Sequence, residues 1–231
     1  MNNNDEKKEI LSLILGLSED EHRKSTLQLA LSQARHMIGY DKNKGISFAG
    51  YACRHMHIQW ENDEINVDLI EDERNNEVVD ICDAFSALTF YLIALDQLGH
   101  IFIKNKRTVR VSDILELSGI VEFNEEETRM AIQQLRNSLC HSFSLANDKK
   151  PIYKYVLCFD DEEMIVKLPL VKYNSDWKDK SEDSKTIIYV FPLCNAIEKA
   201  IANIVSLFER GEIQCRVTEI EELETRFTIL N

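Results

Sequence analysis

Residues 78–103 read VVDICDAFSALTFYLIALDQLGHIFI, and their apolar side chains recur every three to four positions on two sides of a helix. The first stripe comprises Ile81, Phe85, Leu88, Leu92, Leu95 and Phe102, and the second comprises Ala84, Ala87, Tyr91, Ala94 and Leu98. A helix that is apolar on two sides is covered by neighbours on both. The stretch therefore predicts a long helix in the middle of a helical bundle.

The composition is that of a globular protein rich in helices. The chain has 231 residues, 44% of them apolar, which is enough for the core of one large domain or two small ones. Its 7 glycines and 3 prolines are too few for a loop-rich all-β fold. The formal net charge of −13 repels polyanions, so it argues against a general nucleic-acid coat, although a local patch can still bind RNA.

The first 77 residues predict a helical extension that ends in an acidic connector. Helical apolar spacing covers residues 9–17 and 20–38, with Ser18 as the expected N-cap of the second helix. A further helix is predicted from Ser47 to Glu61. Asp and Glu then dominate residues 61–77, which is typical of a solvated link. We therefore divide the chain into an extension, 1–77, and a helical domain, 78–231.

The second half of this domain predicts a small β insertion before the last long helix. Apolar residues alternate from Tyr153 to Phe159 and again from Met164 to Leu170, which predicts an antiparallel hairpin or meander. A third strand is expected at Thr186–Phe191. Pro192 then opens a helix that Gly211 ends. The expected fold is mainly α, a helical bundle with a small antiparallel β insertion.

A shorter helix, expected to start near Asn124 and to bury Ile132, carries the segment Arg136-Asn137-Ser-Leu-Cys-His141. Histidine can move a proton near neutral pH, and arginine can stabilise a charged phosphorane, so the pair suits RNA cleavage by the RNA's own 2′-hydroxyl. Residues five apart point about 140° from each other on an ideal helix. The chemistry therefore requires a distorted helix, a helix terminus or a second protomer; otherwise the two side chains are structural.

The segment resembles the Arg-Asn-x-x-x-His signature of the HEPN (higher eukaryotes and prokaryotes nucleotide-binding) family. That resemblance covers residues 78–210 and implies a HEPN-like helical bundle, a homodimer and a metal-independent endoribonuclease of toxin or phage-defence systems, with RNA as substrate and an antitoxin or other protein as partner. It implies that His141 transfers the proton, Arg136 orients the phosphate and Asn137 shapes the site. A noncatalytic adaptor of the same family is the alternative.

Four cations close to the end of the central helix form a candidate RNA-binding patch: Lys104, Lys106, Arg107 and Arg110. Such residues also occur simply because cations complement the helix dipole at a C-terminus. Two other features are weaker. Residues 40–52 resemble sigma-factor region 2, but acidic sequence follows Trp60, which does not suit a DNA-contacting surface. Cys53, His55 and His57 lack a second half at zinc-ligand spacing, so we expect no metal and no other cofactor.

The remaining sequence features indicate a cytoplasmic protein. The N-terminus, MNNNDEKK, has no apolar signal-peptide core. The apolar run Ala84–Leu95 is shorter than the roughly 20 residues that cross a bilayer, so no membrane span is expected. The six cysteines form no CxxC pair and are expected to be reduced.

Overall fold

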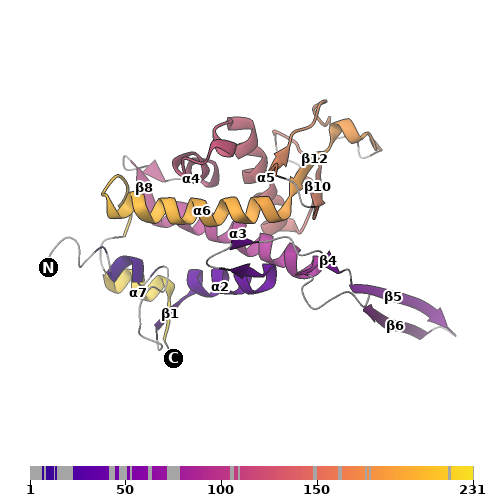
Figure 1. Cartoon of the computed structure of the whole chain (residues 1–231), viewed down its shortest axis with the longest axis horizontal. Coiled ribbons are helices and arrows are strands. Elements are labelled where there is room, and N and C mark those ends of the chain that lie inside the picture. Colours follow the sequence, from indigo (N-terminus) through magenta and orange to yellow (C-terminus); the bar gives the residue numbers. More distant parts are fainter. Residues whose placement is uncertain are drawn as a thin grey trace.

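The computed structural model describes residues 7, 9–12, 14, 23–41, 45–46, 51–52, 54–61, 64–71, 79–104, 107–108, 110–147, 150–160, 163–174, 176, 178–217 and 220–230. Helices dominate this part of the chain, and a three-stranded sheet lies between the last two long helices in sequence (Figure 1). The prediction of a mainly α fold is confirmed.

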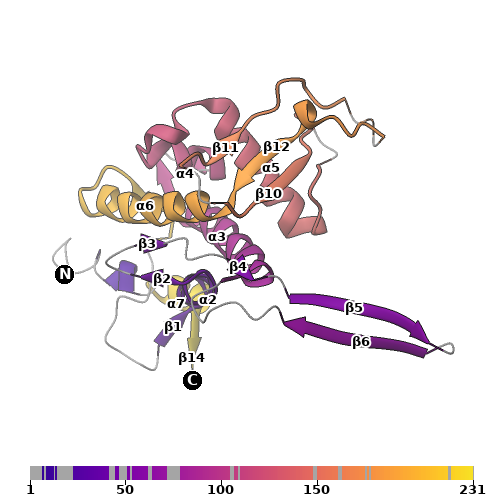
Figure 2. The same ribbon diagram turned by 45° about the vertical axis from the view of Figure 1, so that its right-hand side comes forward.

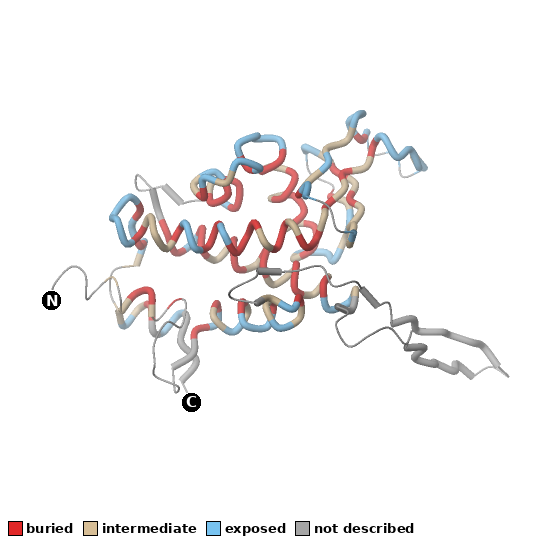
Figure 3. The backbone as a smooth tube through the Cα atoms, in the orientation of Figure 1, coloured by how far each residue is buried: buried red, intermediate tan, exposed pale blue. Residues whose placement is uncertain are grey.

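The helix α3 (Ile81–Ile101) is the centre of the fold. It packs against four other helices: α2 (Thr26–Ile38), α4 (Val111–Leu117), α5 (Glu126–Ser142) and α6 (Val190–Glu209). Both predicted stripes contribute buried residues, among them Leu88 and Leu95 from the first and Tyr91 and Leu98 from the second. Figure 3 shows the buried residues gathered where the helices face one another. The two-sided central helix is thus confirmed, although it begins at Ile81 because Val79–Asp80 form the short strand β7.

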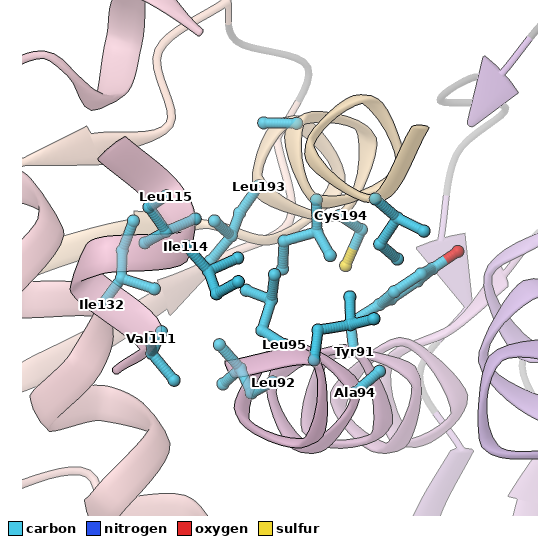
Figure 4. Close-up of a cluster of buried hydrophobic side chains, with 14 of the residues drawn as sticks. Tyr91, Leu92, Ala94, Leu95, Val111, Ile114, Leu115, Ile132, Leu193 and Cys194 are labelled. Carbon is cyan, nitrogen blue, oxygen red and sulfur yellow. The ribbon is translucent and has the colours of Figure 1, made fainter. Parts of the chain in front are cut away.

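The core joins α3 to α4, α5 and α6 (Figure 4). Leu92 and Leu95 of α3 lie beside Ile114 of α4 and Leu193 of α6, and Ile132 of α5 closes one side. Each of these side chains is fully buried. Burial of one such side chain stabilises the fold by roughly 1.5–3 kcal/mol. The same core holds α5 against α3, and the candidate site lies on these two helices.

Several predicted helix ends are observed. Gly119 after α4 and Gly211 after α6 have φ values of 68° and 77°, the left-handed conformation that glycine adopts readily. The helix α2 begins later than predicted, at Thr26, and its N-cap is Ser25, whose side chain accepts a hydrogen bond from Gln28 N at 2.9 Å. Ser18, the predicted N-cap, lies outside the described residues.

Short strands lie near both chain ends: residues 23–25, which were predicted to be helical, form a strand, and two more strands lie in the C-terminal segment that the sequence left ambiguous. The strand β1 (Arg23–Ser25) pairs antiparallel with β14 (Thr228–Leu230), and the helix α7 (Ile220–Phe227) comes just before β14. The strand β13 (Gln214–Cys215) pairs with β8 (Phe102–Lys104), which also pairs with β9 (Arg107–Thr108). The C-terminal residues thus contain strands and a helix, where the sequence was ambiguous between the two.

The predicted helix Ser47–Glu61 is wrong. Its described residues form β4 (Tyr51–Ala52) and β5 (Arg54–Glu61), and β5 pairs antiparallel with β6 (Glu64–Glu71), a hairpin that extends from the helices in Figures 1 and 2. The register places three apolar pairs at alternate positions: Met56–Leu69, Ile58–Val67 and Trp60–Ile65. This period of two is typical of a strand. Part of the predicted acidic connector is therefore a strand.

Two further short strands lie near this region. The strand β2 (Tyr40–Asp41) pairs antiparallel with β3 (Gly45–Ile46), and β4 pairs parallel with β7. The described part of the segment that resembles sigma-factor region 2 is thus built of short strands.

The β insertion is confirmed as three strands, but its predicted hairpin or meander is wrong. The strands are β10 (Tyr155–Cys158), β11 (Val166–Lys167) and β12 (Thr186–Tyr189), in the order β10-β12-β11. The last strand in sequence lies in the middle, parallel to β10 and antiparallel to β11. The central place suits β12 because Thr186 and Ile188 are fully buried. The helix α6 follows directly and begins two residues before Pro192.

Two helices, α3 and α6, have the length and apolar composition to cross a membrane, with mean hydropathies of 1.4 and 1.3. The expectation that the apolar run of α3 is too short for a span was therefore too strict. Both helices pack against each other, and core helices of soluble proteins meet the same criterion.

Candidate active site

The candidate site lies where the C-terminal part of α5 meets the C-terminal part of α3. The helix α5 presents Arg136, Asn137 and His141, and α3 presents Asp96 and His100. The two histidines are exposed, whereas the other three side chains are partly buried. The site therefore combines three partly buried polar side chains with two imidazoles that solvent can reach.

Arg136 and His141 do meet, despite being five residues apart. Arg136 Nη1 lies 3.1 Å from His141 Nε2. The helix ends immediately after this pair, since Phe143 adopts a left-handed conformation (φ 48°) and its N–H bonds to Leu139 O at 3.1 Å. A helix terminus was one of the three conditions that the spacing required. The long arginine side chain spans the remaining angle.

The contact between these two side chains limits the hydrogen-bonding role that each of them can take. A guanidinium group donates and cannot accept, so Nε2 of His141 must be the acceptor. The tautomer with its proton on Nδ1 can take this role. A neutral imidazole is the form that can take a proton from a hydroxyl group.

Asp96 fixes the guanidinium from the other helix. Its Oδ2 accepts a hydrogen bond from Arg136 Nη2 at 2.5 Å, and both side chains are only 16% exposed. Asn137 Oδ1 accepts a second bond from Arg136 Nη1 at 3.2 Å. Arg136 is thus held by two side chains while it contacts His141.

Asp96 and His100 were missing from the predicted site. His100 Nε2 lies 3.6 Å from Asp96 Oδ2, so the carboxylate faces groups from both helices. A signal was present in the sequence: Asp96 interrupts an otherwise apolar helix, and a carboxylate in such a place requires a partner. The sequence does not show that this partner comes from α5.

Cys140 lies beside the same groups but is poorly suited to act as a nucleophile. Burial raises the pKa of the Cys140 thiol, and the nearby positive charge of Arg136 opposes this effect only in part. The thiol therefore remains protonated at neutral pH, and only the thiolate is strongly nucleophilic. His141 is the better candidate for proton transfer here.

Two of the predicted RNA-binding cations lie after α3 on short strands rather than on a helical turn. Lys104 ends β8 and Arg107 begins β9, and Lys106 lies outside the described residues. Arg110 precedes α4, and its backbone N–H donates to Asp113 Oδ2 at 2.8 Å. The side chain of Arg110 is 56% exposed and lies 3.5 Å from the same carboxylate.

Within the described part of the chain, no three or more His, Cys, Asp or Glu side chains are grouped so that they could hold a metal ion. The backbone of His55 and His57 belongs to β5, and Cys53 is not among the described residues.

A second cluster of polar side chains lies deeper, where α2, α3 and α6 meet. Glu198 of α6 accepts two bonds from Arg35 of α2, to Oε1 at 2.7 Å and to Oε2 at 2.9 Å. The hydroxyl of Tyr91 donates a third, at 2.7 Å. Burial, and then the charge of Glu198, raises the pKa of Tyr91 far above its usual value. Figure 4 shows Tyr91 extending from α3 beside α6, with its hydroxyl group directed away from Cys194.

No protein-family model, curated protein or solved structure was found to match this chain. The assignment of a function therefore rests on the geometry of the two helices and on the resemblance of the Arg136–His141 segment.

Proposed function

We propose that this protein is a HEPN-like metal-independent endoribonuclease that cleaves RNA through attack of the RNA's own 2′-hydroxyl. The observation that carries the proposal is the contact of 3.1 Å between Arg136 Nη1 and His141 Nε2, with Asp96 holding the guanidinium. The contact joins the two residue types that the chemistry needs, and the imidazole is exposed to solvent. A cytoplasmic toxin or phage-defence nuclease is the biological role that the resemblance suggests.

In the proposed reaction, the RNA displaces Arg136 from His141 Nε2; this nitrogen then takes the proton of the 2′-hydroxyl, and the 2′-oxygen attacks the adjacent phosphorus. The bond from phosphorus to the 5′-oxygen breaks, and that oxygen takes a proton. The products are a 2′,3′-cyclic phosphate and a 5′-hydroxyl. Arg136 stabilises the additional negative charge of the phosphorane. Asp96 and Asn137 keep the planar guanidinium of Arg136 in position.

We extend the proposal to a homodimer in which two copies of the site line one groove. The reaction needs a base for the 2′-hydroxyl and an acid for the 5′-oxygen, and two His141 residues could fill these roles. Large apolar side chains beside the site favour an interface here: Phe143 is 77% exposed and Leu145 is 41% exposed. Sedimentation at micromolar concentration should give the mass of two chains.

The direct test is incubation of purified protein with single-stranded RNA in EDTA. The proposal predicts fragments that end in a 2′,3′-cyclic phosphate, while DNA of the same sequence remains intact. RNA that survives in EDTA but is cut after addition of a divalent metal would contradict it.

A noncatalytic adaptor is the second candidate, and the net charge of −13 favours it because an acidic surface suits a basic protein partner such as an antitoxin. The same preparation distinguishes the two: an adaptor leaves RNA intact and is recovered from cells with a stable partner. RNA cleavage that persists through purification and is lost in a His141 variant rejects the adaptor.

A further inference from the structure

A pocket of about 620 Å³ lies at the opposite end of α5, beside the β insertion. Its walls come from three segments: the first turn of α5, residues 150–153 and residues 169–174. Figure 2 shows the sheet of the insertion lying beside α5. The volume falls within the range of about 300–1,000 Å³ that is usual for small-molecule sites.

The pocket is separate from the candidate active site. Glu127, which lines it, lies nine residues before Arg136 on the same helix. On an α-helix this spacing corresponds to about 13 Å along the axis and to the opposite side of the helix. A ligand in the pocket therefore does not occupy the Arg136–His141 site of the same chain.

The wall formed by residues 150–153 is held by side chains as well as by backbone. The buried Asn147 donates from Nδ2 to Pro151 O at 2.7 Å and accepts from Tyr153 N at Oδ1 at 2.6 Å. The rings of Tyr153 and Tyr155 are stacked, with centroids 5.9 Å apart, and the hydroxyl of Tyr155 donates to Ala131 O of α5 at 2.8 Å. The wall is thus tied to the helix.

The opposite wall is held by contacts with other segments of the β insertion. Lys154 donates from Nζ to Asp179 O at 2.5 Å, and the same ammonium lies 5.7 Å from the ring centroid of Tyr173. Val171 N bonds to Asp183 O at 3.0 Å. Both walls are therefore held in place by contacts within the chain, as is common for binding pockets.

The lining combines three kinds of group. Its apolar floor consists of Tyr153 and Tyr173, together with an isoleucine and two prolines. Lys150 and Lys172 are exposed and supply positive charge. Glu127 adds a hydrogen-bond acceptor, and burial and then the charge of Glu127 raise the pKa of Tyr153, as expected if the two lie close together.

We infer that this pocket binds a nucleotide, either free or as one unit of a single-stranded RNA. A ligand that satisfies all three kinds of group has a planar apolar part, an anionic group and a polar edge with N–H donors, and a nucleotide has all of these. The base lies on the tyrosine and proline floor, the phosphate lies between Lys150 and Lys172, and the carboxylate of Glu127 accepts from the base. This inference does not depend on RNA cleavage.

The test is a titration of full-length His141→Ala protein, which we expect not to cut RNA, with the four ribonucleoside monophosphates, followed by calorimetry. We expect saturable binding that weakens by about tenfold or more in Lys150→Ala/Lys172→Ala, since each lysine makes a charge-assisted contact to phosphate. The matched control is Lys167→Ala, an exposed lysine on β11 outside the pocket, which should bind like the parent.

Two further experiments show whether the nucleotide is free or part of an RNA, and whether Glu127 contacts the polar edge of the base. A short single-stranded RNA that binds much more tightly than any mononucleotide, with the same lysine dependence, shows that the site holds RNA; equal affinities show a free nucleotide. Glu127→Gln should reduce the preference for bases with an exocyclic amino group over uracil. Absence of binding by any nucleotide or RNA, or binding that is unchanged in the double lysine variant, overturns the inference and leaves the proposed nuclease activity unaffected.

Discussion

The arginine–carboxylate pairs Arg35–Glu198 and Arg136–Asp96 each link two helices of this protein, and they differ in what surrounds them. In the pair Arg35–Glu198, the carboxylate is 9% exposed and accepts three hydrogen bonds, one of them from Tyr91. In the pair Arg136–Asp96, the guanidinium also contacts an exposed histidine, and its buried Nε donates to no group in the described part of the chain. The carboxylate of the first pair has its hydrogen-bond partners within the chain, so we call this the closed pair. The arginine of the second pair can still bind a further ligand.

This difference indicates how a structural ion pair can be told from a functional one. A satisfied polar network stabilises and orients helices, because every group already has a partner. In contrast, an arginine that is held by a carboxylate and also donates to a solvent-exposed imidazole can donate to a substrate instead. We therefore expect changes at the first pair to affect stability and changes at the second to affect RNA cleavage.

The largest expected effect is that of His141→Ala. It should lower the rate of RNA cleavage by on the order of 10²–10⁴, the usual contribution of a positioned acid or base, and it should leave the free energy of unfolding nearly unchanged because the imidazole is exposed. The matched control is His36→Ala, an exposed histidine in the last turn of α2. A His141→Ala protein that cleaves as well as the parent, or that fails to fold, removes His141 from the mechanism.

Arg136→Lys should lower cleavage by on the order of 10², because lysine keeps the charge but cannot contact Asp96 and His141 with one planar fork. Arg35→Lys is the comparison, since it makes the same replacement in the closed pair. We expect this second variant to lose stability in a urea titration and to keep its cleavage rate per folded molecule. Equal loss of cleavage in both variants would show that the two pairs do not differ in role.

Glu198→Gln should lower the free energy of unfolding by about 1.5–3 kcal/mol, since a hydrogen-bonded charge is removed from the junction of α2, α3 and α6. Arg35 is 39% exposed and can still be hydrated, which limits the loss. Urea denaturation followed by circular dichroism measures the effect, and Glu209→Gln at the exposed end of α6 serves as the control. A change below the error of that measurement means that the closed pair contributes little to stability.

Tyr91→Phe should have the smallest effect, about 1 kcal/mol at pH 7, because Glu198 keeps its bonds to Arg35. Burial raises the pKa of Tyr91 in the folded protein, whereas a tyrosine of the unfolded chain ionises near pH 10, roughly its unperturbed value. The stabilisation is therefore present below that pH and is lost as the pH rises above it. Urea titrations at increasing pH should show a shallower decline in the variant than in the parent; parallel curves would contradict this assignment.

How far the sequence predicts this structure depends on whether the deciding pattern is local. The helix α3 and the glycine that ends α6 follow from local spacing and were predicted. The order β10-β12-β11 was not, because alternation identifies strands but the burial of β12 between the other two depends on the whole fold. The hairpin β5–β6 was not predicted, because the acidic residues of β6 are also typical of a solvated link. Its apolar positions do alternate, as expected for a strand.

The candidate site divides in the same way. Arg136, Asn137 and His141 stand together in one segment, so the sequence alone identified them. Asp96 lies on another helix, 40 residues earlier, and its contact with Arg136 exists only once α3 and α5 pack together. The pocket beside α5 likewise joins three separate segments, none of which carries a motif.

The most direct test of the account uses two RNA substrates that are identical except for a single 2′-deoxy nucleotide on the 5′ side of the preferred cleavage position. If the RNA's own 2′-hydroxyl is the nucleophile, the protein in EDTA cuts the all-ribose strand at that position and leaves a 2′,3′-cyclic phosphate, and it does not cut the deoxy-substituted linkage. Cleavage of the substituted linkage at a comparable rate would contradict the assignment of Arg136 and His141 to this chemistry.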